Sequence, residues 1–310
     1  MLVLRLFALI SPLIFQTAVA SNAPDFPFAV PPGQVRIPVL VTDKQGKPVS
    51  GLHVDDFRVF DNGKSVPVAT FLAFSNASSA QAHFTVFYLD DRHLNMEEMQ
   101  GAKQDVAAAL SAALESNGHV AIVTGAGSAN SGFSRDPNQL RQTLTSIQAT
   151  PFAAQGTSSH NFDLIGTYAS LADYASRMSK LPGRRLLVLL SPGFSADFPE
   201  IRSAAALSVD RIVQSGVVLN AFKIQDSTSG SLNDGNIGLE ELTSATGGSF
   251  FLGPTTPPAL TRFPELLYMI DIPLSAIRAD GSSHQLKVAV SRPASRIRAR
   301  KSFVAPGASK

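Results

Sequence analysis

The sequence contains no cysteine among its 310 residues. This excludes a disulfide framework, a thiolate metal site and a cysteine nucleophile, as well as the acylated cysteine of a bacterial lipoprotein. A strong charge of one sign is also missing, because the formal net charge is +2 and the pI is about 8.9. With so mild a balance and no basic cluster, we predict that the protein does not bind nucleic acid.

Common catalytic motifs are missing as well. The chain has no Gly-x-x-x-x-Gly-Lys-Ser/Thr phosphate loop and no Gly-x-Ser-x-Gly elbow. The stretch TGAGS at residues 124 to 128 follows an apolar run, but Asn130 takes the place of the third glycine of a dinucleotide loop. We expect an ordinary loop there, no cofactor and no enzymatic activity. A hydrolase with an unrecognised site, using Ser191 or Ser195 as nucleophile, stays open as an alternative.

Apolar runs that approach the length of a transmembrane helix are missing after the start of the chain. Residues 1 to 20 combine an early Arg5, an apolar core and the ending Ala18-Val19-Ala20, which is typical of a secretory signal peptide. An uncleaved anchor is the alternative. We predict export to the periplasm or the extracellular space, followed by a Pro-rich linker at residues 21 to 33 and no transmembrane span in the mature chain.

The two ends of the mature chain carry β-strand patterns. Between residues 34 and 75, short alternating runs are separated by turn signals such as Asp61-Asn62-Gly63-Lys64. So few strands bury too little surface to fold alone. We therefore predict that this segment packs with a C-terminal β-hairpin, residues 280 to 304, to form a small β-sandwich. Arg296, Arg298 and Arg300 alternate on the last run, and we expect them on one solvated face that could meet an anionic envelope component.

Residues 80 to 275 alternate between strand-like and helix-like stretches. This order is typical of an α/β fold with a doubly wound, mostly parallel sheet of Rossmann type. The uninterrupted apolar run at residues 84 to 89 predicts a central strand buried on both faces, and it stops at Asp90 and Asp91. The carboxyl ends of such strands are where ligands bind. We expect the last helix at residues 259 to 269, and Asp163 on a solvent-facing helix surface.

The stretch VRIPVLVTDKQGKPVSGLHVDDFRVFDNGKSVPVATF, residues 35 to 71, resembles the segment that precedes the von Willebrand factor A-like domain in an exported bacterial family of VWFA-related proteins, abundant in Acidobacteria. Similar pieces follow in order: LDD at 89 to 91, Gly156-Thr157, GRRLLVLLSPG at 183 to 193, TGGSFF at 246 to 251 and HQLKVAVSRPASRIRARKSF at 284 to 303. The resemblance implies a von Willebrand factor A-like doubly wound domain, which in relatives holds a divalent cation at a metal-ion-dependent adhesion site.

Such a site uses oxygen ligands from an Asp-x-Ser-x-Ser loop, a Thr and a further Asp. In this chain Asp90 matches the first Asp, but Arg92 and Leu94 stand at the two Ser positions. Thr157 stands where the Thr ligand is expected, and Ser191-Pro192-Gly193 replaces the turn that carries the later Asp. The resemblance therefore implies a degenerate site in a non-enzymatic binding module.

Two other metal hypotheses use the same loop. A divalent-cation-dependent adhesion domain would hold Mg²⁺ through Asp90, Asp91, Asn95 and Thr157 in altered geometry. A transition-metal site would add the histidines near this edge, His93 and His160, although exposed loop histidines are the simpler expectation.

We expect the binding face to include Arg92, His93, Ser191 and Gly193, with another protein or an envelope component as the partner. The Arg92 guanidinium could lie near the vacant cation position and pair with Asp90 or with another ligand carboxylate.

Overall fold

The computed structural model describes residues 30–75, 81–150, 157–193, 199–224, 236–252, 256–292 and 296–307, without the side chains of residues 157–161 and 257. The predicted signal peptide and most of the linker lie outside these ranges. Within them, no helix is both long and apolar enough to cross a membrane.

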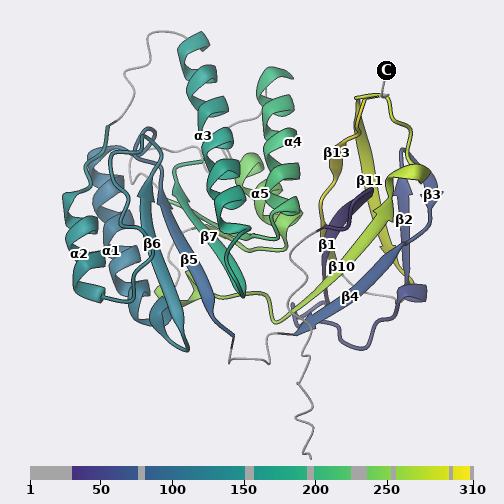
Figure 1. The fold of residues 1–310 in the computed structure, drawn as a ribbon, viewed down its shortest axis with the longest axis horizontal. Coiled ribbons are helices and arrows are strands. Elements are labelled where there is room, and N and C mark those ends of the chain that lie inside the picture. The colour runs from purple at the N-terminus through teal and green to yellow at the C-terminus, as the bar shows by residue number, and fades with distance from the viewer. Residues whose placement is uncertain are drawn as a thin grey trace, which may run out of the picture.

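An α/β unit forms one half of the molecule (Figure 1). Its five-stranded parallel sheet has the order β6-β5-β7-β8-β9, which confirms the predicted doubly wound sheet. The strands are β5 (His83–Leu89), β6 (Gly118–Thr124), β7 (Arg184–Ser191), β8 (Val218–Lys223) and β9 (Phe250–Leu252). The helices are α1 (Met96–Leu114), α2 (Pro137–Ser146), α3 (Thr157–Met178), α4 (Pro199–Gln214), α5 (Asn236–Thr246) and α6 (Pro257–Leu260).

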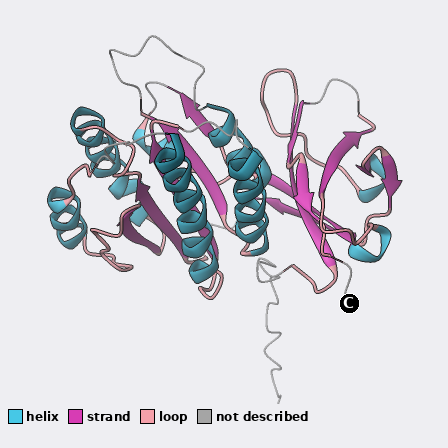
Figure 2. Cartoon of the chain, turned by 90° about the horizontal axis from the view of Figure 1, so that it is seen from above, coloured by secondary structure: helices cyan, strands magenta, loops and turns pink. Residues whose placement is uncertain are grey.

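Strand β5 is buried on both faces, as its unbroken apolar run predicts. Val86 and Tyr88 pack with residues of α3, α4 and α5, whereas Phe87 and Leu89 pack with residues of α1, α2 and α6. Alternate side chains of a strand point to opposite faces, so one strand supplies both cores. Figure 2 shows the helices on both sides of the sheet.

A β-sandwich forms the other half. One sheet has the order β12-β1-β10-β4 and the other β13-β11-β2-β3. Their strands are β1 (Gln34–Thr42), β2 (Phe57–Asp61), β3 (Lys64–Val66), β4 (Thr70–Ser75), β10 (Leu266–Pro273), β11 (Ser283–Val290), β12 (Arg296–Ala299) and β13 (Ser302–Val304). A short 3-10 helix, Val54–Asp56, precedes β2, and another, Leu274–Ala276, follows β10. The two sheets share one apolar core, so the predicted sandwich of N- and C-terminal strands is confirmed.

The predicted helix at residues 259 to 269 is wrong. The helix ends at Leu260, and β10 runs antiparallel between β1 and β4. Its pattern has period two, since Tyr268 and Ile270 fill the sandwich core while Leu267 and Met269 lie in a separate apolar cluster. The boundary expected at residue 275 is therefore too late, because β10 already belongs to the sandwich.

The C-terminal strands do not form the hairpin that the sequence predicted. Strands β11 and β12 lie in different sheets, and β11 pairs instead with β13. The chain turns at Arg300, which is buried and forms an ion pair with Asp210 of α4. Arg296 and Arg298 are exposed, but Arg300 is not on a solvated face, because its charge is paired across the contact between the two halves.

His284 of β11 is buried between two carboxylates. Its Nδ1 lies 2.8 Å from Oδ1 of Asp61, and its Nε2 lies 3.2 Å from Oδ1 of Asp280. Burial alone would lower the pKa of His284, but the hydrogen bonds to Asp61 and Asp280 and their charges outweigh it, so the pKa is raised above 6.5.

This arrangement makes the stability of the sandwich depend on pH. Because the folded-state pKa of His284 exceeds the unfolded value, the stabilisation is complete below about pH 6.5 and is lost as the pH rises through the folded-state pKa. We expect the melting temperature of the wild type to exceed that of His284→Gln by more at about pH 6 than at about pH 9. Thermal unfolding at the two pH values tests this, and an equal difference at both would contradict it.

Candidate functional site

The carboxyl end of β5 turns sharply beneath the surface. Asp90 and Asp91 are both fully buried. The amides of His93 and Leu94 donate to the carbonyl of Asp90 over 3.1 and 2.9 Å, which closes the turn. Leu94 is fully buried among residues of α1. The leucine that departs from the adhesion-site pattern therefore anchors this loop to the core.

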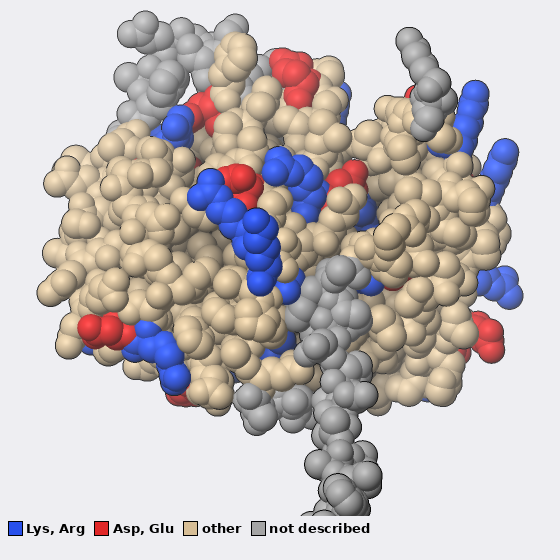
Figure 3. Space-filling model, viewed as in Figure 1, with Lys and Arg blue, Asp and Glu red and all other residues tan. Residues whose placement is uncertain are grey.

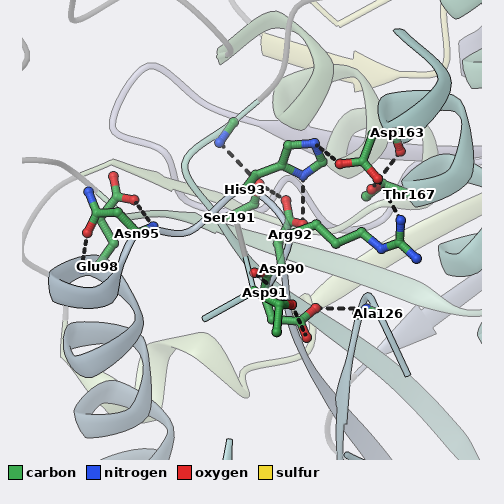
Figure 4. Close-up of polar contacts among 12 residues, drawn as sticks. Asp90, Asp91, Arg92, His93, Asn95, Glu98, Ala126, Asp163, Thr167 and Ser191 are labelled. Atoms are coloured by element: carbon green, nitrogen blue, oxygen red, sulfur yellow. Dashed lines mark hydrogen bonds and ion pairs between the residues drawn. The ribbon is translucent and has the colours of Figure 1, made fainter. Parts of the chain in front are cut away.

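Both carboxylate oxygens of Asp90 are bonded within the protein. Oδ1 lies 2.8 Å from Nδ1 of His93, and Oδ2 accepts a hydrogen bond of 2.7 Å from the Ser191 hydroxyl at the end of β7. The amide of Gly193 donates in turn to the Ser191 oxygen over 3.1 Å. Gly193 has φ of 92°, a backbone conformation that favours glycine. These contacts link the ends of two neighbouring strands (Figure 4).

His93 connects Asp90 to a third carboxylate. Its Nε2 forms an ion pair of 3.0 Å with Oδ2 of Asp163 on α3, and Oδ1 of Asp163 accepts a hydrogen bond of 2.7 Å from Nη1 of Arg92. We call Ser191, Asp90, His93, Asp163 and Arg92 the His93 network. Asp163 is buried and does not face solvent as expected, and Arg92 pairs with Asp163 and not with Asp90. Nor is His93 an exposed loop histidine, because its side chain is 9% exposed.

Electrostatics favour a protonated His93. Burial alone would lower its pKa, but the hydrogen bond to Asp90 and the charges of Asp90 and Asp163 outweigh burial and the repulsion from Arg92, so the pKa is raised. The hydrogen bond to Asp163 likewise raises the pKa of Arg92. The His93 ring thus lies between two buried carboxylates, and the partly exposed Arg92 guanidinium contacts Asp163.

Asp91 has a different set of partners. Its Oδ1 accepts from the amide of Ala126 over 2.8 Å, and its Oδ2 accepts from the hydroxyls of Ser128 and Thr150 over 3.0 and 3.3 Å. A side chain at Gly125 would approach the Tyr88 hydroxyl to 2.8 Å, so the loop needs glycine there. The stretch at residues 124 to 128 is therefore a loop wrapped around a carboxylate. That charge would repel a phosphate, in line with the expected ordinary loop.

Asn95, another predicted metal ligand, does not join Asp90 and Asp91. Asn95 caps α1, since its side chain accepts from the Glu98 amide over 2.9 Å while Glu98 accepts from the Asn95 amide over 2.8 Å. Figure 4 shows this pair apart from the His93 network. Thr157 begins α3, and its side chain lies outside the described residues, as does that of His160. In the described ranges, no group of three or more His, Asp or Glu side chains is arranged to hold a metal.

The contacts of Ser191 do not suit a nucleophile. Its side chain is fully buried and its hydroxyl donates to Asp90, which separates it from His93. A serine nucleophile instead needs the base itself within hydrogen-bonding reach. Burial also keeps Ser191 from the expected binding face, whereas the Arg92 side chain is 40% exposed. Ser195 lies outside the described residues.

Exposed apolar side chains surround the same edge of the sheet. In a parallel sheet flanked by helices, the strands end and the following helices begin at this carboxyl edge. The large apolar residues exposed there are Met96 at 79%, Phe162 at 75%, Ile237 at 65% and Leu252 at 46%. Met96 and Ile237 lie at the starts of α1 and α5, Phe162 lies in the second turn of α3, and Leu252 ends β9. Sequence analysis missed them, because their exposure depends on how each helix start is placed against the sheet.

The His93 network should stabilise the fold chiefly through its buried cation. His93→Ala leaves Asp90 and Asp163 buried without the imidazolium, and we expect it to lower the free energy of unfolding by about 3 kcal/mol or more. Arg92→Ala is the control, with an expected loss of about 1 kcal/mol or less because its side chain is partly in solvent. Urea denaturation of both variants measures this. Equal losses would show that His93 is not needed as a buried cation.

No family model matches the chain, and no curated protein matches it. Solved structures with some likeness include the conserved hypothetical protein BatB from Bacteroides thetaiotaomicron, with 13% identity, 58% of this chain and 93% of that chain covered, and a TM-score of 0.37. The N-terminal domain of TFIIH p34 is 13% identical, the match covers 59% of this chain and 96% of that chain, and the TM-score is 0.39. Proximal thread matrix protein 1 from the mussel byssus, with a zinc-occupied MIDAS motif, is 11% identical. The match covers 66% of this chain and 49% of that chain, with a TM-score of 0.40. At such scores we transfer no property of these proteins.

Proposed function

We propose that the protein is an exported, non-enzymatic interaction module of von Willebrand factor A type, which binds another protein at the carboxyl edge of its parallel sheet. The observation that supports this most is the exposure of Met96, Phe162, Ile237 and Leu252 around that edge. Exposed aromatic residues and methionines are enriched in protein-binding sites. The leader-like residues 1 to 20 support export.

The proposed binding does not use a bridging cation. Both oxygens of Asp90 and both oxygens of Asp163 already contact His93, Ser191 or Arg92. A divalent cation would have to displace the imidazolium and break these bonds before it could reach the carboxylates. The His93 network therefore supports a degenerate adhesion site, in which protein cations take the place of the metal.

The distribution of surface charge agrees with a protein partner. On the face drawn in Figure 3, Lys and Arg side chains are scattered among Asp and Glu side chains and do not form one basic patch. Arg300, one of the three arginines considered for an anionic envelope component, is paired with Asp210. Binding to nucleic acid or to an anionic surface generally requires clustered positive charge.

Substitutions at the edge test the binding surface. With the purified chain from Ser21 onward as bait for envelope proteins, we expect Phe162→Asp and Ile237→Asp to lose partners that the wild type retains. A charge in the desolvated centre of an interface opposes binding. Phe133→Asp is the matched control, since Phe133 is 39% exposed and its ring lies against Phe84 at the amino end of β5, opposite the carboxyl edge. Partners retained by both edge variants would argue against this surface.

Melting temperatures with EDTA and with millimolar Mg²⁺ test the cation hypothesis. We expect no difference, because the carboxylates are already paired. A site filled at a hundredfold over its dissociation constant would add about 2.7 kcal/mol, which is a rise of several degrees. Such a rise would contradict the degenerate site and favour the divalent-cation-dependent adhesion domain.

A further inference from the structure

A groove of about 630 Å³ lies between the helices α3 and α4 and the β-sandwich. Ile165 of α3, Leu207 of α4 and Phe303 of β13 contribute apolar surface to it. Leu207 is 53% exposed, although it lies in the middle of its helix. Figure 1 shows α4 on the side of the α/β unit that faces the sandwich. Sites for small molecules are typically concave, mostly apolar and of this volume, so the groove has the size and lining of such a site.

The charges that line the groove leave one cation in excess. Asp210 is the only acidic side chain among the described residues of the lining, and both of its oxygens are used, one by Arg300 and the other by a backbone amide of β13 over 3.0 Å. Arg36 forms a buried ion pair with Asp271. Arg211 is exposed and has no ion pair with any residue that the structure describes. The groove therefore carries one positive charge that the described protein does not balance.

Ser208 adds a second polar group beside this charge. The residue lines the groove and is 6% exposed, and its hydroxyl makes no hydrogen bond with the described part of the chain. Buried hydroxyl groups generally have a hydrogen-bond partner. Residues three positions apart on a helix are neighbours on one face, so Ser208 and Arg211 can contact the same bound group. A hydroxyl and a guanidinium both donate, which favours a negatively charged acceptor such as a carboxylate.

We propose that this groove binds one free long-chain carboxylate. The acyl chain packs on Leu207 and Ile165, and the headgroup accepts hydrogen bonds from Ser208 and Arg211. One negative charge balances the one cation in excess, and the apolar lining removes the chain from water, which supplies most of the affinity. The inference goes beyond the proposed protein-binding edge, because none of the exposed apolar residues named for that edge lines the groove.

Isothermal titration with octanoate, decanoate and dodecanoate tests the apolar part of the proposal. With the chain from Ser21 onward, we expect one molecule to bind per chain. The affinity should rise about fourfold for each added methylene group, because each one is removed from water in the groove. No binding, an affinity that does not rise with chain length, or many molecules bound per chain would overturn the proposal. So would tighter binding to vesicles of an anionic phospholipid than to free dodecanoate, since the ligand would then be a membrane surface.

Substitutions in α4 separate the headgroup from the chain. Arg211→Gln should weaken decanoate binding about tenfold and leave the binding of decanol unchanged, because only the carboxylate pairs with the guanidinium. Leu207→Asp should weaken both ligands at least about tenfold, since it places a charge against the acyl chain. Arg177→Gln is the matched control, because Arg177 is an exposed arginine of α3 outside the groove. Equal effects of Arg211→Gln on decanoate and decanol would overturn the proposal, and so would unchanged binding in Leu207→Asp.

Discussion

The structure of the sheet edge depends on how three buried carboxylates are neutralised. An ionised carboxylate beneath the surface is costly unless it is paired and hydrogen-bonded. The protein meets this requirement in two ways. Asp90 and Asp163 share the His93 imidazole, and Asp91 takes an amide and two hydroxyl groups from the neighbouring loops.

These pairings determine the shape of the edge. The His93 network joins the ends of β5 and β7 to the start of α3, while Asp91 joins β5 to the loop after β6. In a cation-dependent adhesion site, an exchangeable ion would perform part of this linking. Here side chains of the protein itself make these links, because His93, Ser191 and Arg92 contact Asp90 or Asp163. A preorganised surface loses less conformational freedom when a partner binds.

The parts of the fold that could be predicted are those with local patterns. The unbroken apolar run of β5 and the alternating strands at both ends of the chain were sufficient to predict the doubly wound sheet and the sandwich. The segment of β10 was misassigned because a short apolar run such as LLYMIDIP suits either a helix or a buried strand. Pro264, which lies between the short helix and this strand, marks the break between them. At the site, the departures at Arg92 and Leu94 predicted that the metal loop is altered. The partner of Arg92 could not be predicted, because Asp163 lies 71 positions away and only the tertiary fold brings the two together. The capping role of Asn95 was available from the sequence, since Asn-x-x-Glu before an alanine-rich run is typical of a helix start.

The interleaved sandwich has a consequence for how the protein acquires its structure. Strand β1 pairs only with β10 and β12, and its Arg36 forms a buried ion pair with Asp271, 235 positions further along. Strand β1 must therefore remain without its partners until nearly the whole chain has emerged, although β2 can pair with β3 as soon as both are made. Contacts this distant in sequence slow folding, and unpaired strands are prone to aggregate in the meantime. The α/β unit can form its own core earlier, so we expect closure of the sandwich to be the last and slowest step and the one most in need of a chaperone.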